Sequence, residues 1–264
     1  GPPGRDMRVV FMGTPGFSLP TLEALIRGGY RVVAVYTQPD RPAGRGRGLK
    51  PPPVKQAALS YGIPVEQPES LRRPQPQEQL AALAPDIIVV AAYGEILPPE
   101  VLALPRHGCL NIHPSLLPRY RGPSPIASAI LAGEGETGVT IMLLDEGLDS
   151  GPILAQRRVG IGRRETAGEL EGRLARLGAE LLLETIPAWT GGRLTPRPQD
   201  EARATYTRPI TKHDGEIDWS LPAEEIERRV RAFDPWPGCY TYWEGKRLKI
   251  VGARVLPGGS APPG

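Results

Sequence analysis

The strongest constraint on the fold is an alternation between short apolar runs rich in β-branched residues and segments with apolar residues at helical spacing. Residues 8–12 predict a strand, 19–26 a helix and 31–36 a second strand, a βαβ unit whose crossover should be right-handed. The alternation predicts an α/β fold with a doubly wound, mostly parallel sheet. Further helices are predicted at 54–61, 77–83, 100–104, 125–131 and 166–186, and further strands at 86–91, 109–112, 138–144 and 153–159.

Glycines and prolines divide the chain into two parts. Gly191, Gly192, Pro196 and Pro198 follow the last long helical segment and mark a linker. We expect a first domain over residues 1–190, a linker over 191–206 and a smaller, β-rich domain over 207–264, with residues 1–6 a possible non-native leader. The second part carries a predicted helix at 222–233 and strands at 239–243 and 247–251. Because a lone hairpin is marginal in water, this domain is expected to be incomplete in the sequence given.

Composition narrows the class of protein. The 264 residues carry 32 Lys and Arg against 29 Asp and Glu, a net charge of +3 that permits an anionic partner without requiring one. Cys109 and Cys239 are far apart and suggest neither a disulfide nor a thiolate metal site. No apolar run approaches the roughly 20 residues of a membrane span. We expect a cytoplasmic protein that uses no metal, has no membrane association and is by default a monomer.

An amide and an imidazole, those of Asn111 and His113, lie two residues apart in a predicted strand. Residues i and i+2 of a strand share a face, and Pro114 should end the strand, so both side chains are expected at its carboxyl end, where open α/β sheets bind ligands. Asp149 adds a carboxylate in a probable turn. Each residue alone also fits a local role in satisfying backbone groups. Together they supply the groups that stabilise a tetrahedral oxyanion.

The surrounding motifs resemble a known family, the folate-dependent formyltransferases. The resemblance runs from about residue 7 to residue 237 and is fullest to the members that act on initiator methionyl-tRNA. It implies a Rossmann-like catalytic domain followed by a small OB-like domain, and transfer of a formyl group from 10-formyltetrahydrofolate to the methionine amine of that tRNA. The motifs are Asn111-x-His113-x-Ser115-Leu116-Leu117-Pro118-x-Tyr120-Arg121-Gly122, Gly147-Leu148-Asp149-Ser150-Gly151, Phe11-Met12-Gly13-Thr14-Pro15, Thr37 to Gly46, Ala92-Tyr93-Gly94-x-Ile96-Leu97-Pro98, Thr137 to Met142, Ile217-Asp218-Trp219 and Arg231 to Pro237.

The resemblance also implies roles for particular residues. Asn111, His113 and Asp149 match the catalytic trio; we expect the first two to polarise the formyl oxygen and Asp149 to keep His113 charged and to hold a proton-carrying water. The pterin pocket is expected to be lined by backbone groups of Ile96 and Leu97. The folate-contacting segment is expected to be Ser115, Leu116, Leu117 and Pro118.

A basic, glycine- and proline-rich insertion follows the second predicted strand. A charge run of this kind is usually a solvated loop. This one is longer than most strand-to-helix connections and matches the family insertion that contacts the tRNA acceptor end, so we expect phosphate and base contacts from Arg41, Arg45, Arg47 and Lys50. Trp219, Trp236 and Trp243 are expected to form a core in the second domain rather than stacking platforms for bases.

Two rival functions remain at this stage. A folate-dependent formyltransferase or hydrolase could pass the formyl group to a small amine or to water. A tRNA-binding module without enzymatic activity could keep the fold, although the intact trio disfavours it. Acceptor specificity separates the three hypotheses.

Overall fold

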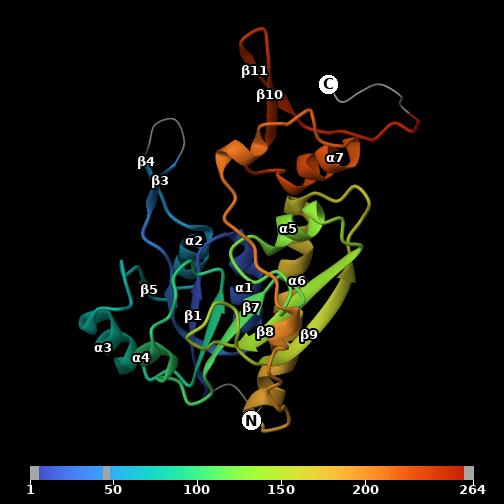
Figure 1. Ribbon diagram of the computed structural model, residues 1–264. Helices are drawn as coiled ribbons and strands as arrows, with labels where there is room; N and C mark the ends of the chain where they lie inside the picture. Colours follow the sequence, from blue (N-terminus) through green and yellow to red (C-terminus); the bar gives the residue numbers. More distant parts are fainter. Residues whose placement is uncertain (1–5, 44–47, 259–264) are drawn as a thin grey trace.

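The computed structural model describes residues 6–43 and 48–258 of the chain. In these residues seven strands form one sheet, in the order β5-β2-β1-β6-β7-β8-β9 (Figure 1). The first five strands of that order are parallel, whereas β8 and β9 are antiparallel additions at one edge. The predicted mostly parallel sheet is therefore confirmed. Its strands are β1 (Arg8–Gly13), β2 (Arg31–Tyr36), β5 (Val65–Glu66), β6 (Ile87–Ala91), β7 (Cys109–His113), β8 (Glu136–Leu143) and β9 (Ile153–Gly160).

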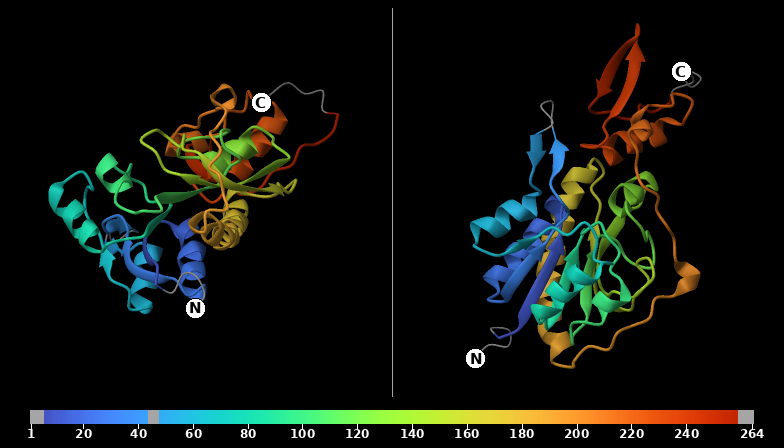
Figure 2. Two further views of the ribbon diagram at one scale, coloured as in Figure 1. Left: turned by 90° about the horizontal axis from the view of Figure 1, so that it is seen from below. Right: turned by 90° about the vertical axis from the view of Figure 1, so that its left-hand side faces the viewer.

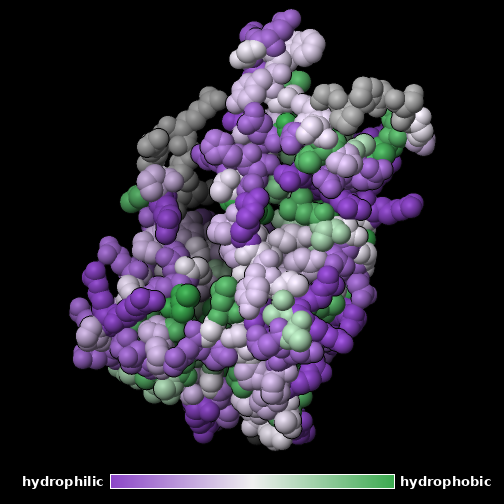
Figure 3. Space-filling view, viewed as in Figure 1, coloured by the Kyte–Doolittle hydropathy of each residue, from purple (hydrophilic) through white to green (hydrophobic). Residues whose placement is uncertain are grey.

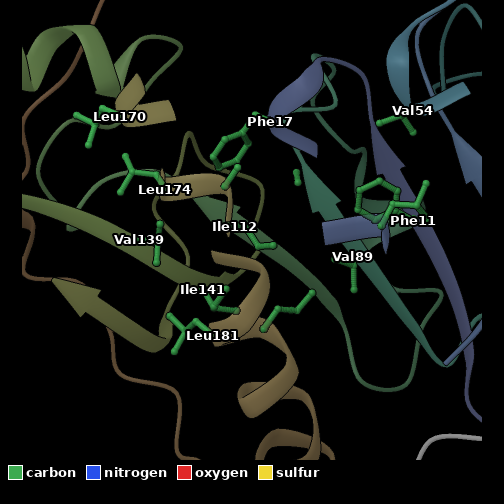
Figure 4. Packing of buried hydrophobic residues seen from close by; sticks show 14 of the residues in the cluster. Phe11, Phe17, Val54, Val89, Ile112, Val139, Ile141, Leu170, Leu174 and Leu181 are labelled. Carbon is green, nitrogen blue, oxygen red and sulfur yellow. The ribbon is translucent and has the colours of Figure 1, made fainter. Parts of the chain in front are cut away.

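Helices cover both faces of the sheet, as a doubly wound fold requires (Figures 1 and 2). Side chains alternate along each strand: in β1, Val9 and Phe11 pack with α1, α2 and α6, whereas Val10 and Met12 pack with α3 and α4. Figure 4 shows the first of these layers, with Leu181 of α6 close to the strands. The helices are α1 (Leu19–Arg27), α2 (Pro53–Ser60), α3 (Pro74–Ala82), α4 (Pro99–Leu102), α5 (Pro125–Leu131), α6 (Ala167–Thr190) and α7 (Ala223–Ala232).

The strand order indicates where a fold of this kind binds a ligand. Strand β1 lies between β2 and β6. The connection after β1 runs toward β2, whereas the chain after β6 continues toward β7 on the opposite side, so the two loops separate at the carboxyl edge of the sheet. Just before the loops separate, the strand ends pack closely at Gly13, where a Cβ would lie 2.6 Å from Ser18 Cβ and 2.8 Å from the Ala91 carbonyl oxygen. The Ser18 hydroxyl, from the short η1 turn (Gly16–Ser18), donates a 2.7 Å hydrogen bond to that carbonyl. Strand β7 pairs in parallel with β6, so its carboxyl end lies at the same edge of the sheet.

Helix α6 is longer than predicted. It begins with a capping box formed by Thr166 and Glu169, at the predicted start, but continues through Pro187 to Thr190. Near that end, Trp189 donates its indole N–H to the carbonyl of His107 at 2.8 Å and packs against the core. Tertiary contacts of the last turn therefore outweigh the helix-breaking tendency of the proline.

The basic insertion differs from the expected loop. Arg41–Ala43 (β3) and Gly48–Lys50 (β4) pair as an antiparallel hairpin, with Arg41 opposite Lys50. Only the pairing itself reveals these strands, because each has three residues and no alternating pattern. The hairpin projects beyond the body of the molecule in Figure 1 and in the right-hand view of Figure 2.

The chain after α6 forms two short 3-10 turns, helix α7 and a hairpin. The turns are η2 (Glu201–Arg203) and η3 (Lys212–Gly215), and the hairpin joins β10 (Cys239–Trp243) to β11 (Lys246–Ile250). Phe233, at the end of α7, is 1% exposed and belongs to the main core, so α7 is packed on the first part of the chain. No helix within residues 6–43 and 48–258 has both the length and the apolar character needed to cross a bilayer.

The expectation for three tryptophans is wrong. Trp219, Trp236 and Trp243 are 44%, 53% and 69% exposed. Trp243 belongs to a two-stranded hairpin, and Trp219 and Trp236 lie in the segments just before and after α7, where no strand or helix among the described residues buries their rings.

Candidate active site

His113 is the last residue of β7 and is held at the carboxyl end of the sheet. Its side chain is 6% exposed, and its Nε2 lies 2.9 Å from the carbonyl oxygen of Tyr120. Because a carbonyl only accepts, Nε2 carries the hydrogen, and Nδ1 faces the Asp149 carboxylate at 3.7 Å. The structure thus brings two members of the expected trio together, although 36 residues separate them in sequence (149 minus 113).

Asp149 lies in the loop between β8 and β9 and adopts a left-handed backbone conformation, with φ of 49°. Its Oδ2 accepts a 2.8 Å hydrogen bond from the backbone N–H of Gly122. Tyr120, whose carbonyl holds His113, also has a positive φ, of 59°. Such conformations cost about 1–3 kcal/mol each and persist where the surroundings enforce them, often at functional sites. The Tyr120 carbonyl accepts from His113, and the Gly122 N–H donates to Asp149. Tyr120 and Gly122 are the two neighbours of Arg121 in the sequence.

Asn111 shares the face of β7 that carries His113. Cys109, two residues earlier, packs in the core layer of α3 and α4, whereas Leu110 and Ile112 point to the α6 side. By strand alternation, Asn111 and His113 therefore lie on the Cys109 face. Asn111 is half-buried at the carboxyl end of β7.

Two effects of the structure act in opposite directions on the charge of His113. Burial lowers the pKa of His113 from its ordinary value of 6.5, and the nearby Asp149 carboxylate and Tyr120 carbonyl only partly offset that effect. Burial thus opposes the charge on His113, whereas the Asp149 carboxylate favours it. The cost of burial depends on the packing around the ring and cannot be predicted from the sequence.

Stability should depend on the titration of His113. Because its pKa is lowered in the folded state, the unfolded chain takes up the proton first as the pH falls through 6.5, and this proton uptake favours unfolding. In His113→Asn, the loss of unfolding free energy between about pH 7.5 and about pH 5.5 should be smaller than in the wild type. Urea denaturation of both proteins at each pH measures the difference. Equal losses would show that His113 does not titrate in this window.

The expected folate segment forms a tight, well-anchored turn after β7. The hydroxyl of Ser115, which is fully buried, donates to the Arg119 carbonyl at 2.7 Å. Leu117 is bound through its backbone N–H to Thr140 and through its carbonyl to Gln156. Leu116 and Pro118 are partly exposed. The segment therefore presents a shaped surface rather than free polar side chains.

The expected pterin-lining pair divides between surface and core. Ile96 is 61% exposed, whereas Leu97 is 5% exposed and packs in the layer of α3 and α4. A contact of this loop through its backbone remains compatible with both placements.

The four basic residues expected to bind tRNA are described only in part. Arg41 is exposed in β3, and the backbone of Lys50 belongs to β4. Arg45 and Arg47 lie outside the described residues, so their placement stays a prediction.

Sequence reasoning missed two buried polar side chains next to the trio, those of Arg121 and Gln199. Arg121 is 1% exposed and Gln199 is 8% exposed. Arg121 lies inside one of the motifs given above, but nothing in the neighbouring residues indicates that its side chain is buried. Arginine is rarely fully buried, so an exposed side chain was the ordinary expectation. Gln199 falls in the segment that was expected to be a linker, where no spacing or periodicity distinguishes it.

The fold and this site define a class of protein. The family model described as formyl transferase matches residues 7–186, and the model described as formyl transferase, C-terminal domain, matches residues 209–264. An N-formyltransferase from Helicobacter canadensis, solved with folinic acid and dTDP-3-aminofucose, has a similar fold with a TM-score of 0.71 at 21% identity, over 93% of this chain and 86% of that one. These matches identify the class as formyl transferases.

Relatives of higher identity narrow the class. The methionyl-tRNA formyltransferase of Chloroflexus aurantiacus is 58% identical over 249 residues, which cover 94% of this chain and 80% of the relative. That of Methylococcus capsulatus is 54% identical over 259 residues, which cover 98% of this chain and 84% of the relative. The chain belongs to the methionyl-tRNA formyltransferase family.

Proposed function

We propose that this chain transfers the formyl group of 10-formyltetrahydrofolate to the α-amino group of methionine carried by initiator tRNA. The observation that carries the proposal is the buried His113–Asp149 pair, held beside Asn111 at the carboxyl edge of the sheet. Family membership supports the same reaction. The proposal includes the cytoplasm as its location, a monomer as the working species, and catalysis by residues 1–190 with tRNA contacts from residues 207–264.

The reaction needs no strong base to deprotonate the amine, but it needs strong stabilisation of the oxyanion. An α-amine has a pKa of about 8, so roughly a tenth of it is neutral and nucleophilic at pH 7. Attack on the formyl carbon places negative charge on its oxygen, and a well-aimed donor can stabilise that charge by about 3 kcal/mol. We assign such a donor role to the amide of Asn111.

We assign to His113 and Asp149 the transfer of the proton that the attacking amine loses. The attacking nitrogen becomes acidic as it bonds to carbon, and the unprotonated Nδ1 of His113 can accept its proton, directly or through a water. The resulting imidazolium adds positive charge near the oxyanion, and the Asp149 carboxylate 3.7 Å away stabilises it. The same proton can then pass to N10 of the departing tetrahydrofolate, which returns His113 to its neutral state.

The loop expected to receive the pterin carries unusual polar atoms. Within the part of the chain that the structure describes, three buried side-chain atoms have no hydrogen-bond partner: Gln38 Nε2, Tyr93 OH and Glu95 Oε2. Tyr93 and Glu95 lie within three residues of Ile96, and Gln38 lies next to Gly94. An unpaired buried polar atom costs about 1–3 kcal/mol, so a ligand rich in donors and acceptors, such as a pterin, would relieve this cost.

The placement of the two hairpins supports a tRNA acceptor. Hairpins β3–β4 and β10–β11 project beyond the same end of the molecule in Figure 1 and in the right-hand view of Figure 2. Figure 3 shows a largely hydrophilic surface over the β10–β11 hairpin. The hairpin also carries the exposed cations Arg247 and Lys249 and the exposed rings of Tyr242 and Trp243. Cations and exposed aromatic rings are the groups that bind phosphates and bases.

Neutralising Arg41 should weaken tRNA binding without affecting the formyl donor. Arg41 is exposed at the base of the β3–β4 hairpin, which Lys55 and Asp40 anchor through a 2.9 Å ion pair. In Arg41→Ala the KM for methionyl-tRNA should rise several-fold, and the slope of log affinity against log salt should fall by about 1. Arg72→Ala, an exposed arginine before α3, is the matched control. An equal change in both variants would point to general attraction rather than a contact of the hairpin.

One assay separates the proposed function from its rivals. The purified chain is given 10-formyltetrahydrofolate with methionyl initiator tRNA, with methionyl elongator tRNA, with a small amino sugar or with no acceptor. Formylation of the initiator tRNA well above the other arms is expected. Turnover that is equal without an acceptor would indicate a hydrolase, preference for the sugar would indicate a small-amine enzyme, and tRNA binding without turnover would indicate a nonenzymatic module.

A further inference from the structure

We propose that Arg121 and Gln199 are positioning residues, which hold the His113–Asp149 pair in place through the segment that connects α6 to α7. The inference rests on the proposed function, since it concerns the geometry of that reaction. Residues 197–207 are here called the strap. In Figure 1 and in the right-hand view of Figure 2, the connection between α6 and α7 runs along the body of the first domain rather than hanging free.

The strap is bonded along its length to the loops of the site. Arg197 pairs with Ile153 in both directions, at 2.8 and 2.9 Å. Thr205 donates its N–H to the Pro118 carbonyl and accepts from the N–H of Arg121, and Thr207 donates to the Arg121 carbonyl at 2.7 Å. With this many backbone hydrogen bonds to the first domain, the strap is an integral part of that domain. It loses its contacts with the loops of the site only if these hydrogen bonds break.

Gln199 bridges two loops through the two ends of its amide. Its Nε2 donates to the carbonyl of Asp149 at 2.8 Å and to that of Gly151 at 2.7 Å. Its Oε1 accepts from Nη2 of Arg121 at 2.9 Å and from Nε at 3.2 Å. All four hydrogen-bonding positions of this buried amide are thus used, two on each loop, which fixes the distance between the loops.

Arg121 closes the network from the other side. Its guanidinium also donates to Glu201 at 2.7 and 2.9 Å and to the Tyr206 hydroxyl at 3.0 Å, both on the strap. The backbone groups on either side of Arg121 hold the catalytic candidates, since the Tyr120 carbonyl accepts from His113 and the Gly122 N–H donates to Asp149. A shift of Arg121 therefore moves both contacts at once, and misplacement by about 1 Å can cost a hundredfold in rate.

Two substitutions of Gln199 separate positioning from simple support. Gln199→Glu keeps an acceptor for Arg121 and adds an ion pair, but it removes both donors to the Asp149 loop. Gln199→Met is neutral, similar in length, and removes all four bonds. Both variants should lower kcat for methionyl-tRNA formylation by about 10- to 100-fold, with the KM for the formyl donor within about threefold of the wild type. The melting temperature of Gln199→Glu should fall, because two buried carbonyls lose their donors, but by less than that of Gln199→Met, because only Glu keeps an acceptor for Arg121.

The neighbouring Asp200→Asn is the matched control, because an amide oxygen can still cap the backbone N–H of Ala202, and it should leave kcat unchanged. A kcat within about threefold of the wild type in Gln199→Glu overturns the inference, and so does a loss of kcat/KM carried mainly by KM. If Gln199→Met does not fold, Gln199→Glu decides alone.

A spectroscopic readout keeps the strap testable apart from the reaction. The Nε2–H of His113, bonded to the Tyr120 carbonyl, should give a slowly exchanging imidazole resonance in ¹⁵N-edited spectra of the wild type. Its exchange with water should accelerate at least tenfold in both Gln199 variants, and an unchanged rate overturns the inference. No formylation of methionyl-tRNA by the wild-type chain would instead count against the proposed function, and the resonance would still report on the strap.

Discussion

Asp149→Asn is expected to lower kcat by about a thousandfold while the KM for the formyl donor changes by less than about threefold. Opposite charges about 4 Å apart gain roughly 4 kcal/mol at the effective dielectric constant that applies near a protein surface, and 1.36 kcal/mol corresponds to a tenfold change in rate. The carboxylate lies 3.7 Å from His113 Nδ1 and is mostly buried, so an imidazolium that forms there would lose this stabilisation in the variant. The amide oxygen of asparagine can still accept from Gly122, which keeps the loop in place.

Steady-state kinetics with methionyl-tRNA, combined with direct measurement of folate binding, test this prediction. Glu136→Gln, which removes an exposed carboxylate at the start of β8, is the control and should retain wild-type kcat. A kcat of Asp149→Asn within tenfold of the wild type would remove the carboxylate from any role in stabilising charge on His113.

Gly122→Ala should damage both stability and catalysis. Gly122 has φ of 108°, and a Cβ at this position would lie 2.7 Å from Thr207 Oγ1 and 2.9 Å from the Thr207 carbonyl oxygen, which belongs to the strap. We expect a loss of about 2–4 kcal/mol in the free energy of unfolding from the strained backbone and the displaced strap. The kcat should fall about a hundredfold as well, because the Gly122 N–H that holds Asp149 must move.

Gly29→Ala provides the comparison that isolates crowding from backbone conformation. Gly29 also has a positive φ, of 82°, but nothing lies within 4 Å of the Cβ position. Its substitution should cost only about 1 kcal/mol and leave kcat unchanged. Urea denaturation and formylation kinetics of both variants measure the two effects. Similar behaviour of the two variants would mean that the contact with Thr207 is unimportant.

Local patterns in the sequence were sufficient for the framework of the fold. Strands such as β1 and β6 carry apolar residues on both faces, and α5 and β10 have the predicted bounds because periodicity and nearby prolines or glycines are short-range signals. The β3–β4 hairpin was missed because its strands are short and depend on pairing. The surface tryptophans were misplaced because burial depends on which elements cover them.

Some features of the candidate site could likewise be predicted from the sequence, and others could not. Sequence alone determined the class of fold, the family, and the residues Asn111, His113 and Asp149 as candidates for the chemistry, since spacing within a strand and ordered motifs can be read along the chain. Only the tertiary structure decided that burial lowers the pKa of His113 and that Arg121 and Gln199, 78 residues apart, connect the loops that hold it. The physical reason is that a pKa depends on the solvent excluded by neighbouring elements, and a hydrogen-bond network depends on side chains that meet only after the chain has folded.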